Sequence, residues 1–149
     1  MRAILFPGQG SQYVGMGLDF YEKFDLAKKI FETVDKSLGF SLSKIIFNGP
    51  QEQLQLTQNT QPAIMTVGVS IFNVLNQEYG LKLNNASFFA GHSLGEYSAL
   101  VANESLSFKD SIKLFTFFFV LPKAFTLEIF FIFDVSLPSR TKPIIPIPL

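Results

Sequence analysis

The segment Gly91-His92-Ser93-Leu94-Gly95 fits the pattern Gly-x-Ser-x-Gly. This pattern is typical of a nucleophile elbow, in which a serine occupies a sharp turn between a strand and a helix. The flanking glycines lack side chains, so the strand and the helix can come close together around Ser93. At the start of a helix, the amide of Leu94 faces an oxyanion formed on an attacked carbonyl. The pattern predicts acyl chemistry at Ser93; the alternative is a plain glycine-rich turn.

A second glycine-rich segment, residues 7–12, follows a short apolar run at residues 3–6. Its spacing misses the dinucleotide fingerprint Gly-x-Gly-x-x-Gly, and no Lys follows Gly15 as a phosphate-binding loop requires, so nucleotide binding is not expected. In a parallel sheet, the loops after the carboxyl ends of strands share one edge. We therefore expect this loop to face the Ser93 elbow and to supply a second oxyanion amide, unless it is a plain connection.

A serine nucleophile needs a base, and the chain offers only poor ones. Its single His is His92, the neighbour of Ser93. Adjacent side chains on an elbow point in different directions, so we interpret His92 as a packed residue that shapes the pocket. Carboxylates such as Glu96, Glu104 and Asp110 are weak bases. No complete catalytic triad can be assembled from these residues.

The composition excludes several classes of function. Twelve basic and twelve acidic side chains cancel, so the chain has no field that would attract nucleic acid or an anionic membrane. It has no Cys and one His, which disfavours disulfides, thiolate chemistry and zinc. We expect neither a metal nor a cofactor. With 149 residues, 48% of them hydrophobic, one domain is expected.

Membrane and secretory segments are not expected either. The stretch Leu114–Leu137 is apolar, but Lys123, Glu128 and Asp134 interrupt it below the roughly 18 clean residues that a membrane span needs. The apolar run at the N-terminus is too short for a secretory signal, so we expect a cytoplasmic location.

Strand and helix signals alternate over the first 115 residues, which predicts an α/β fold with a mainly parallel sheet. Short apolar runs at residues 3–6 and 86–90 predict buried strands. Helices are predicted at residues 26–38, 61–79 and 94–102, with one more that starts at Ser107.

Capping residues place the ends of these helices. Asp25 is expected to cap the first helix and Gly39 to end it. Thr60 is expected to cap the second, with Pro62 in its first turn. Ser107 with Asp110 three residues later resembles a capping box.

The composition changes near Phe115. All ten Gly lie before residue 116, whereas residues 116–149 hold seven of the eighteen Phe and five of the eight Pro. The prolines of residues 138–149 exclude a regular helix or inner strand and indicate an extended or disordered tail. We therefore divide the chain into residues 1–115 and a divergent Phe- and Pro-rich tail, residues 116–149.

Three segments, in this order and spacing, resemble the malonyl-CoA:acyl carrier protein transacylase family. They are Phe6–Gln12, Gln58–Ala63 and Gly91–Leu100. The resemblance covers about residues 1–115. It implies the N-terminal part of the larger, α/β-hydrolase-like subdomain of that family, a parallel sheet with flanking helices. The smaller, ferredoxin-like subdomain of the family is missing from this stretch.

The resemblance implies a reaction and its participants. Ser93 would accept malonyl from coenzyme A and pass it to the phosphopantetheine thiol of acyl carrier protein, a ping-pong transfer in fatty acid biosynthesis. The backbone amides of Gln9 and Leu94 match the oxyanion hole of the family. Gln61 and His92 match residues near its active site, where they would contact the substrate.

The chain also departs from this pattern. The family continues into a helix whose Arg pairs with the malonyl carboxylate, where this chain reads Phe117-Phe118-Phe119 and has only Arg2 and Arg140 elsewhere. The catalytic His of the family comes later still. A shifted reading frame or a sequencing error near Phe115, or a decaying gene, would explain the break. Because the base and the carboxylate-binding Arg are both absent, the chain as written is expected to be inactive. A serine esterase-like hydrolase and a non-catalytic remnant are the alternative hypotheses.

Overall fold

A small parallel sheet organises the chain. The computed structural model describes residues 1–120 and 144–146, with side chains described to residue 115. Strands β1 (Ala3–Phe6) and β2 (Phe88–Gly91) pair in parallel, with Ala3 opposite Phe88 and Phe6 opposite Gly91. Strand β3 (Ile144–Pro146) pairs in parallel with β2, so the sheet order is β1-β2-β3. The predicted α/β class with a parallel sheet is confirmed.

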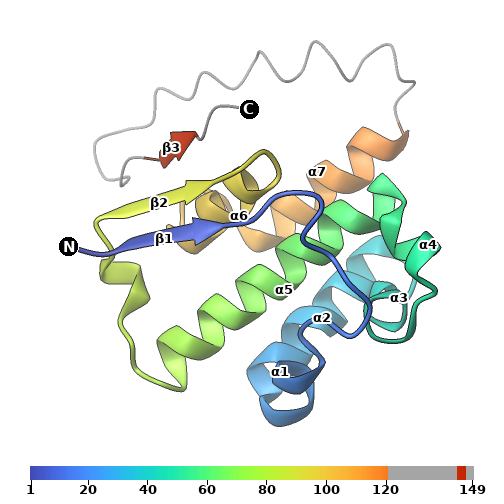
Figure 1. Ribbon diagram of the computed structural model, residues 1–149, viewed down its shortest axis with the longest axis horizontal. Coiled ribbons are helices and arrows are strands. Elements are labelled where there is room, and N and C mark those ends of the chain that lie inside the picture. Colours follow the sequence, from blue (N-terminus) through green and yellow to red (C-terminus); the bar gives the residue numbers. More distant parts are fainter. Residues whose placement is uncertain (121–143, 147–149) are drawn as a thin grey trace.

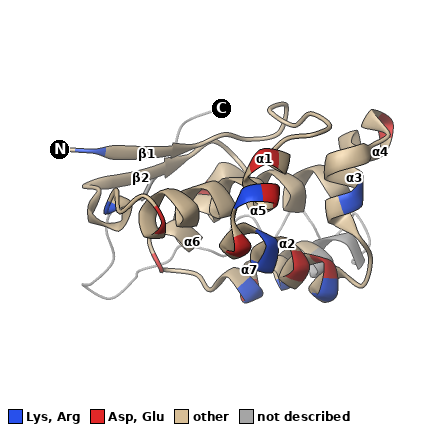
Figure 2. Cartoon of the chain, turned by 90° about the horizontal axis from the view of Figure 1, so that it is seen from below, with Lys and Arg blue, Asp and Glu red and all other residues tan. Residues whose placement is uncertain are grey.

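The helices lie on one side of this sheet, as Figures 1 and 2 show. Helix α5 is the longest of the described helices and runs beneath β1. The helices are α1 (Leu18–Lys23), α2 (Asp25–Leu38), α3 (Leu42–Asn48), α4 (Gln51–Gln55), α5 (Thr57–Gln77), α6 (Gly95–Ala102) and α7 (Phe108–Val120), with a short 3-10 turn, η1 (Leu83–Asn85).

The predicted strands differ in accuracy. The first was placed correctly at residues 3–6. The second spans Phe88–Gly91 in place of the predicted residues 86–90, and the amide of Ala86 instead donates to the Leu83 carbonyl at the end of η1. Strand β3 was not predicted, because the prolines of residues 138–149 indicated an extended or disordered tail. It occupies an edge of the sheet, the position that tolerates proline.

Helix α2 confirms the helix predicted at residues 26–38, but its N-terminal cap differs from the prediction. The helix ends at Gly39, whose φ of 75° is the left-handed conformation that glycine adopts readily. Asp25, however, is the first residue of the helix and not its cap. Its carboxylate forms an ion pair of 3.2 Å with Lys28. The acidic group still lies in the first turn, where its negative charge interacts favourably with the helix dipole.

Helix α5 begins four residues earlier than predicted, at Thr57 in place of Gln61, and ends at Gln77. Thr60 is buried inside it, and its hydroxyl donates to the carbonyl of Leu54 at 2.5 Å. The Thr60 side chain, which was expected to cap the helix, thus forms a hydrogen bond between α4 and α5. Pro62 lies in the second turn, where its missing amide leaves one carbonyl of the first turn without a helical partner.

Helix α7 begins as the capping box predicts. The amide of Asp110 donates to the Ser107 hydroxyl at 3.1 Å, and that hydroxyl donates to the Asp110 carboxylate at 2.6 Å. The helix continues to Val120, beyond the predicted break in composition at Phe115. Up to residue 120, no helix is long and apolar enough to cross a membrane. Most of the stretch Leu114–Leu137 lies outside the described residues.

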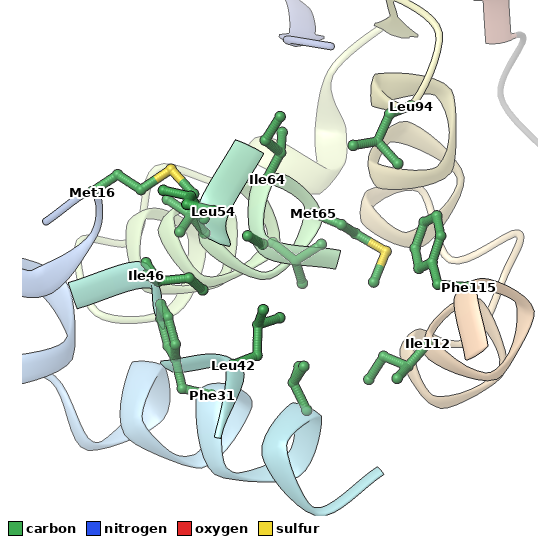
Figure 3. Packing of buried hydrophobic residues seen from close by; sticks show 14 residues of the cluster. Met16, Phe31, Leu42, Ile46, Leu54, Ile64, Met65, Leu94, Ile112 and Phe115 are labelled. Carbon is green, nitrogen blue, oxygen red and sulfur yellow. The ribbon is translucent and has the colours of Figure 1, made fainter. Parts of the chain in front are cut away.

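The main core lies among the helices, around α5. Figure 3 shows Phe31 and Leu42 facing Ile46 on one side of Met65, with Phe115 on the other. Phe31 and Phe115 are at most 2% exposed, and Leu42, Ile46 and Met65 are fully buried. A smaller cluster joins β1 and β2 to α5 and α6, with the ring of Phe72 6.1 Å from Phe6 and 6.0 Å from Phe89. The sheet is therefore fixed to the helices through one face.

Candidate active site

Ser93 lies in the turn between β2 and α6. Its φ of 52° places it in the left-handed region, which costs a residue with a side chain about 1 kcal/mol or more. Two backbone hydrogen bonds hold the turn: the Gly95 amide donates to the His92 carbonyl at 2.9 Å, and the Glu96 amide to the Ser93 carbonyl at 3.0 Å. Ser93 is exposed. A strained, exposed serine between a strand and a helix is the geometry of a nucleophile elbow.

The glycines of the motif are required by the packing of the backbone. A Cβ atom on Gly91 would overlap the backbone of Gly95, and a Cβ atom on Gly95 would overlap the carbonyl of Phe6. The two strands and the first turn of α6 are therefore in direct backbone contact. Any side chain at either position would push α6, and with it Ser93, away from the sheet.

The loop after β1 lies against the elbow. A Cβ atom on Gly8 would come within 2.5 Å of the His92 carbonyl oxygen and 2.8 Å of His92 Nδ1. The His92 amide also donates to the Phe6 carbonyl at 3.2 Å. Within the loop, the Ser11 hydroxyl donates to the Gly8 carbonyl at 2.9 Å. The residue after Gly8 is Gln9, so the structure brings the Gln9 backbone to the elbow.

Two backbone amides in this region are available to a ligand. Within residues 1–120 and 144–146, neither the Gln9 amide nor the Leu94 amide donates a hydrogen bond. Gln9 is exposed, whereas the side chain of Leu94 is buried in the main core. The core thereby holds the Leu94 backbone in place. Their role as an oxyanion hole stays a prediction.

His92 and Glu96 form the electrostatic surroundings of Ser93. Burial raises the pKa of the Glu96 carboxyl, and the charge interaction with His92 partly offsets this rise. His92 is half-buried against Gly8, which agrees with a residue that shapes the site. Of the other carboxylates considered as bases, Asp110 has its pKa lowered, chiefly by the hydrogen bond from Ser107, and this makes it a weaker base.

Gln61 is half-buried in the second turn of α5. Helix α5 begins at the end of the molecule toward which β1 and β2 point, as Figure 1 shows. This is the end at which the elbow follows β2. The proposed contact of Gln61 with substrate stays a prediction. Among the described residues, no group of three or more His, Asp or Glu side chains could hold a metal ion.

Sequence analysis expected the loop at residues 7–12 to face the elbow, but it did not identify Gly8 as the residue in contact with His92. The signal was a glycine two residues after a strand, but the contact that makes it necessary is with His92, 84 positions later in the chain. Only the pairing of β1 with β2 brings the two together.

Residues 4–126 match the family model described as acyl transferase domain. This chain belongs to the acyl transferase domain family. The match extends eleven residues beyond residue 115, where the sequence changes in composition.

Named relatives in the family are transacylases. The chain is 49% identical over 110 residues to the malonyl CoA-acyl carrier protein transacylase of Bacillus subtilis, a match that covers 74% of this chain and 33% of the relative. It is 40% identical over 112 residues to the Escherichia coli enzyme of the same name, with 75% and 35% covered. The chain thus spans about a third of the length of these relatives.

A solved structure supports the fold assignment. The acyl-carrier-protein S-malonyltransferase of Bartonella henselae superposes with a TM-score of 0.74 at 46% identity, over 79% of this chain and 38% of that one. A malonyl-transacylase in complex with a type II PKS acyl carrier protein superposes with a TM-score of 0.72 at 42% identity, over 78% and 37%. The α/β arrangement of the described residues is therefore that of transacylases.

Proposed function

We propose that Ser93 is the nucleophile of a malonyl transfer from malonyl-CoA to acyl carrier protein. The observation that carries the proposal is the elbow itself: an exposed serine with φ of 52° in a turn whose glycines are required by backbone contact. The names of the relatives supply the acyl group and the two thioester partners. The finer fold proposal is that the sheet belongs to an α/β-hydrolase-like subdomain.

In the first half-reaction, the Ser93 oxygen attacks the thioester carbonyl carbon of malonyl-CoA. A bond from Ser93 Oγ to that carbon forms, the carbon–sulfur bond breaks, and coenzyme A leaves as the thiol with the proton that Ser93 gives up. The carbonyl oxygen carries the negative charge of the tetrahedral intermediate. The amides of Gln9 and Leu94, supported by the N-terminus of α6, would stabilise this charge.

In the second half-reaction, the phosphopantetheine thiol of acyl carrier protein attacks the malonyl ester. A new thioester forms and Ser93 regains its proton. His92 and Gln61 are proposed to contact the acyl group. The chain supplies the nucleophile and the oxyanion donors; the base for this exchange is not among the residues identified in it.

The test is malonylation of the serine. Because the chain as written is expected to be inactive, the test uses a frame-restored chain, in which residues 1–120 continue into the remaining length of the Bacillus subtilis relative. This chain is incubated with malonyl-CoA, and the peptide that contains Ser93 is examined by mass spectrometry for the added malonyl group. Ser93→Ala abolishes the adduct, whereas Ser87→Ala, an exposed serine outside the elbow, retains it. An adduct that survives in the Ser93→Ala chain refutes the assignment. Malonate released at the rate of acyl-enzyme formation, without acyl carrier protein, would instead identify a hydrolase.

A further inference from the structure

The hydroxyl of Ser11 holds the peptide group that carries the Gln9 amide. Ser11 Oγ donates to the Gly8 carbonyl oxygen at 2.9 Å, which is within the ordinary range for a hydrogen bond between two oxygens. The backbone amide of Ser11 donates to the same carbonyl, but at 3.4 Å this bond is long. Of the two donors, the side chain therefore holds the Gly8 carbonyl more firmly.

The Gly8 carbonyl and the Gln9 amide belong to one peptide group. This group is planar and trans, so its C=O and N–H bonds point in opposite directions. Because Ser11 draws the carbonyl into the turn formed by residues 8–11, the Gln9 N–H points out of that turn. A carbonyl that accepts a hydrogen bond also polarises its peptide group, which strengthens the N–H as a donor. The Ser11 hydroxyl thus sets both the direction and the strength of the Gln9 amide.

The elbow holds its own amide in the same way. The Leu94 N–H shares a peptide group with the Ser93 carbonyl, which accepts a hydrogen bond from the Glu96 amide at 3.0 Å. In both places, a carbonyl accepts from the residue three positions later in the chain. At the elbow the donor is the backbone of α6, whereas in the loop the shorter bond comes from a side chain. A single substitution can therefore remove the donor in the loop without changing the helix.

The rest of the loop is held independently of the Ser11 hydroxyl. After the turn peptide, the Gly10 amide donates to Gln12 Oε1 at 2.8 Å, and Gly10 has a φ of 107° that glycine adopts readily. Before it, Gly8 packs against the backbone and ring of His92. Loss of the hydroxyl should thus leave the loop beside the elbow and release only one peptide group.

We propose that Ser11 is a positioning residue for acyl transfer, and that its hydroxyl directs the Gln9 amide toward the oxyanion formed when Ser93 attacks an acyl group. The proposal rests on the proposed function, because it requires an acyl group at Ser93. The oxyanion exists only in the tetrahedral intermediate and the transition states beside it. Ser11 therefore affects the rate of Ser93 acylation and not the binding of malonyl-CoA.

The first experiment measures the amide without any reaction. Relaxation and residual dipolar couplings of the Gln9 amide are recorded by NMR in the 149-residue chain. The parent amide should be rigid, with an order parameter of about 0.85, and Ser11→Ala should lower this value below about 0.6 and change the dipolar coupling. Ser11→Thr keeps a hydroxyl at an exposed position and should restore both.

Ser37→Ala is the matched control for this substitution. The Ser37 hydroxyl also donates to a backbone carbonyl, that of Thr33, at 2.8 Å, but it lies on α2 outside the loop and the elbow. Its removal should leave the Gln9 amide unchanged. If the order parameter and the dipolar coupling of Gln9 are the same in Ser11→Ala and in the parent, the proposal is overturned.

The second experiment separates positioning from a structural role. The frame-restored chain is mixed with malonyl-CoA, and single-turnover rates of Ser93 malonylation are measured over a range of malonyl-CoA concentrations. Ser11→Ala should lower the limiting rate about tenfold, which is less than the roughly hundredfold or larger loss that follows removal of an oxyanion donor. The half-saturating concentration should change less than about twofold. Ser11→Thr should recover most of the rate, and Ser37→Ala should match the parent.

The outcomes distinguish this proposal from the proposed function. A frame-restored parent that is never malonylated at Ser93 refutes the proposed function. If the parent is malonylated and Ser11→Ala reacts at the same limiting rate, only the role of Ser11 is refuted. A raised half-saturating concentration with an unchanged rate, or equal losses in Ser11→Ala and Ser11→Thr, would also overturn that role, because substrate binding or packing would then account for the effect.

Discussion

The helical core and the serine elbow achieve rigidity in opposite ways. In the core, large side chains such as Phe31 and Phe115 fill the space between helices and are at most 2% exposed. At the elbow, Gly91 and Gly95 leave no room for even one added carbon, because backbone meets backbone. The core is therefore stabilised by the area it buries, whereas the elbow is fixed by close backbone contact, which holds Ser93 at an unfavourable φ.

The two regions meet at Leu94, which links stability to chemistry. Its side chain belongs to the main core, while its amide lies directly after Ser93. Tyr97, one turn into α6, also packs against this core, with its ring 5.5 Å from that of Phe115. Changes in the core should thus affect how much protein is folded, and changes at the elbow should affect what the folded protein can do.

The largest expected loss of stability comes from a substitution in the helical core. Phe31→Ala should lower the free energy of unfolding by about 3–5 kcal/mol, because it removes a fully packed ring and leaves a cavity. Urea unfolding followed by circular dichroism measures this, since the chain has no Trp. Malonylation of Ser93 per folded molecule should stay unchanged. A variant that keeps its stability but loses labelling would contradict the separation of the two regions.

The second-largest expected effect comes from a substitution in the serine elbow. Gly95→Ala should lower the free energy of unfolding by about 3 kcal/mol, because its Cβ atom would overlap the Phe6 carbonyl. It should also abolish Ser93 malonylation in the molecules that remain folded. Gly68→Ala in α5 is the control, since its Cβ atom would meet Phe6 at an ordinary 3.4 Å. If both substitutions had the same small effect, close backbone contact would not govern the elbow.

Strain at Ser93 can be measured apart from reactivity. Ser93→Gly should be more stable than Ser93→Ala by about 1 kcal/mol, because glycine adopts the observed φ of 52° without the cost that a Cβ atom carries. Both variants lack the nucleophile and should show no malonylation. Equal stabilities in urea unfolding would mean that the turn stores no strain.

The elbow was predictable because residues that are close together in the sequence determine its geometry. A glycine two residues before and after a serine, between an apolar run and a helix signal, specifies the turn without knowledge of distant residues. The end of α2 at Gly39 and the start of α7 at Ser107 were predictable for the same reason. Each depends on hydrogen bonds or φ angles within a few residues.

The features that could not be predicted depend on how separate elements pack together. Thr60 resembled a helix cap, but its hydroxyl donates to Leu54 of the neighbouring helix α4, and α5 starts earlier. The necessity of Gly8 appears only when β1 lies beside His92. Among the described residues, β1 has a strand partner on one edge only. This could not be predicted either, because an apolar run such as residues 3–6 predicts a strand but not how many neighbours it has.

The smallest expected effect concerns Glu96, which lies between the two regions. Its pKa is raised above the ordinary 4.5, mainly by burial, so the folded chain holds the proton more tightly than the unfolded chain. Stability should therefore be highest below pH 4.5, fall as the pH rises through the window up to the raised pKa, and stay lower above it. The effect is small because the carboxylate is only partly buried.

Glu96→Gln removes this titration and keeps the shape of the side chain. Its stability relative to the parent chain should rise with pH across that window and then become constant. Glu32→Gln, at an exposed position on α2, is the control and should follow the parent. The test is to measure the urea midpoints of unfolding from pH 4 to pH 7. If the midpoints of Glu96→Gln and of the parent chain change with pH in parallel, the Glu96 carboxylate is exposed to water and the prediction is wrong. A rising difference would instead show that the first turn of α6 is held against the core, which is the condition for the Leu94 amide to keep its place beside Ser93.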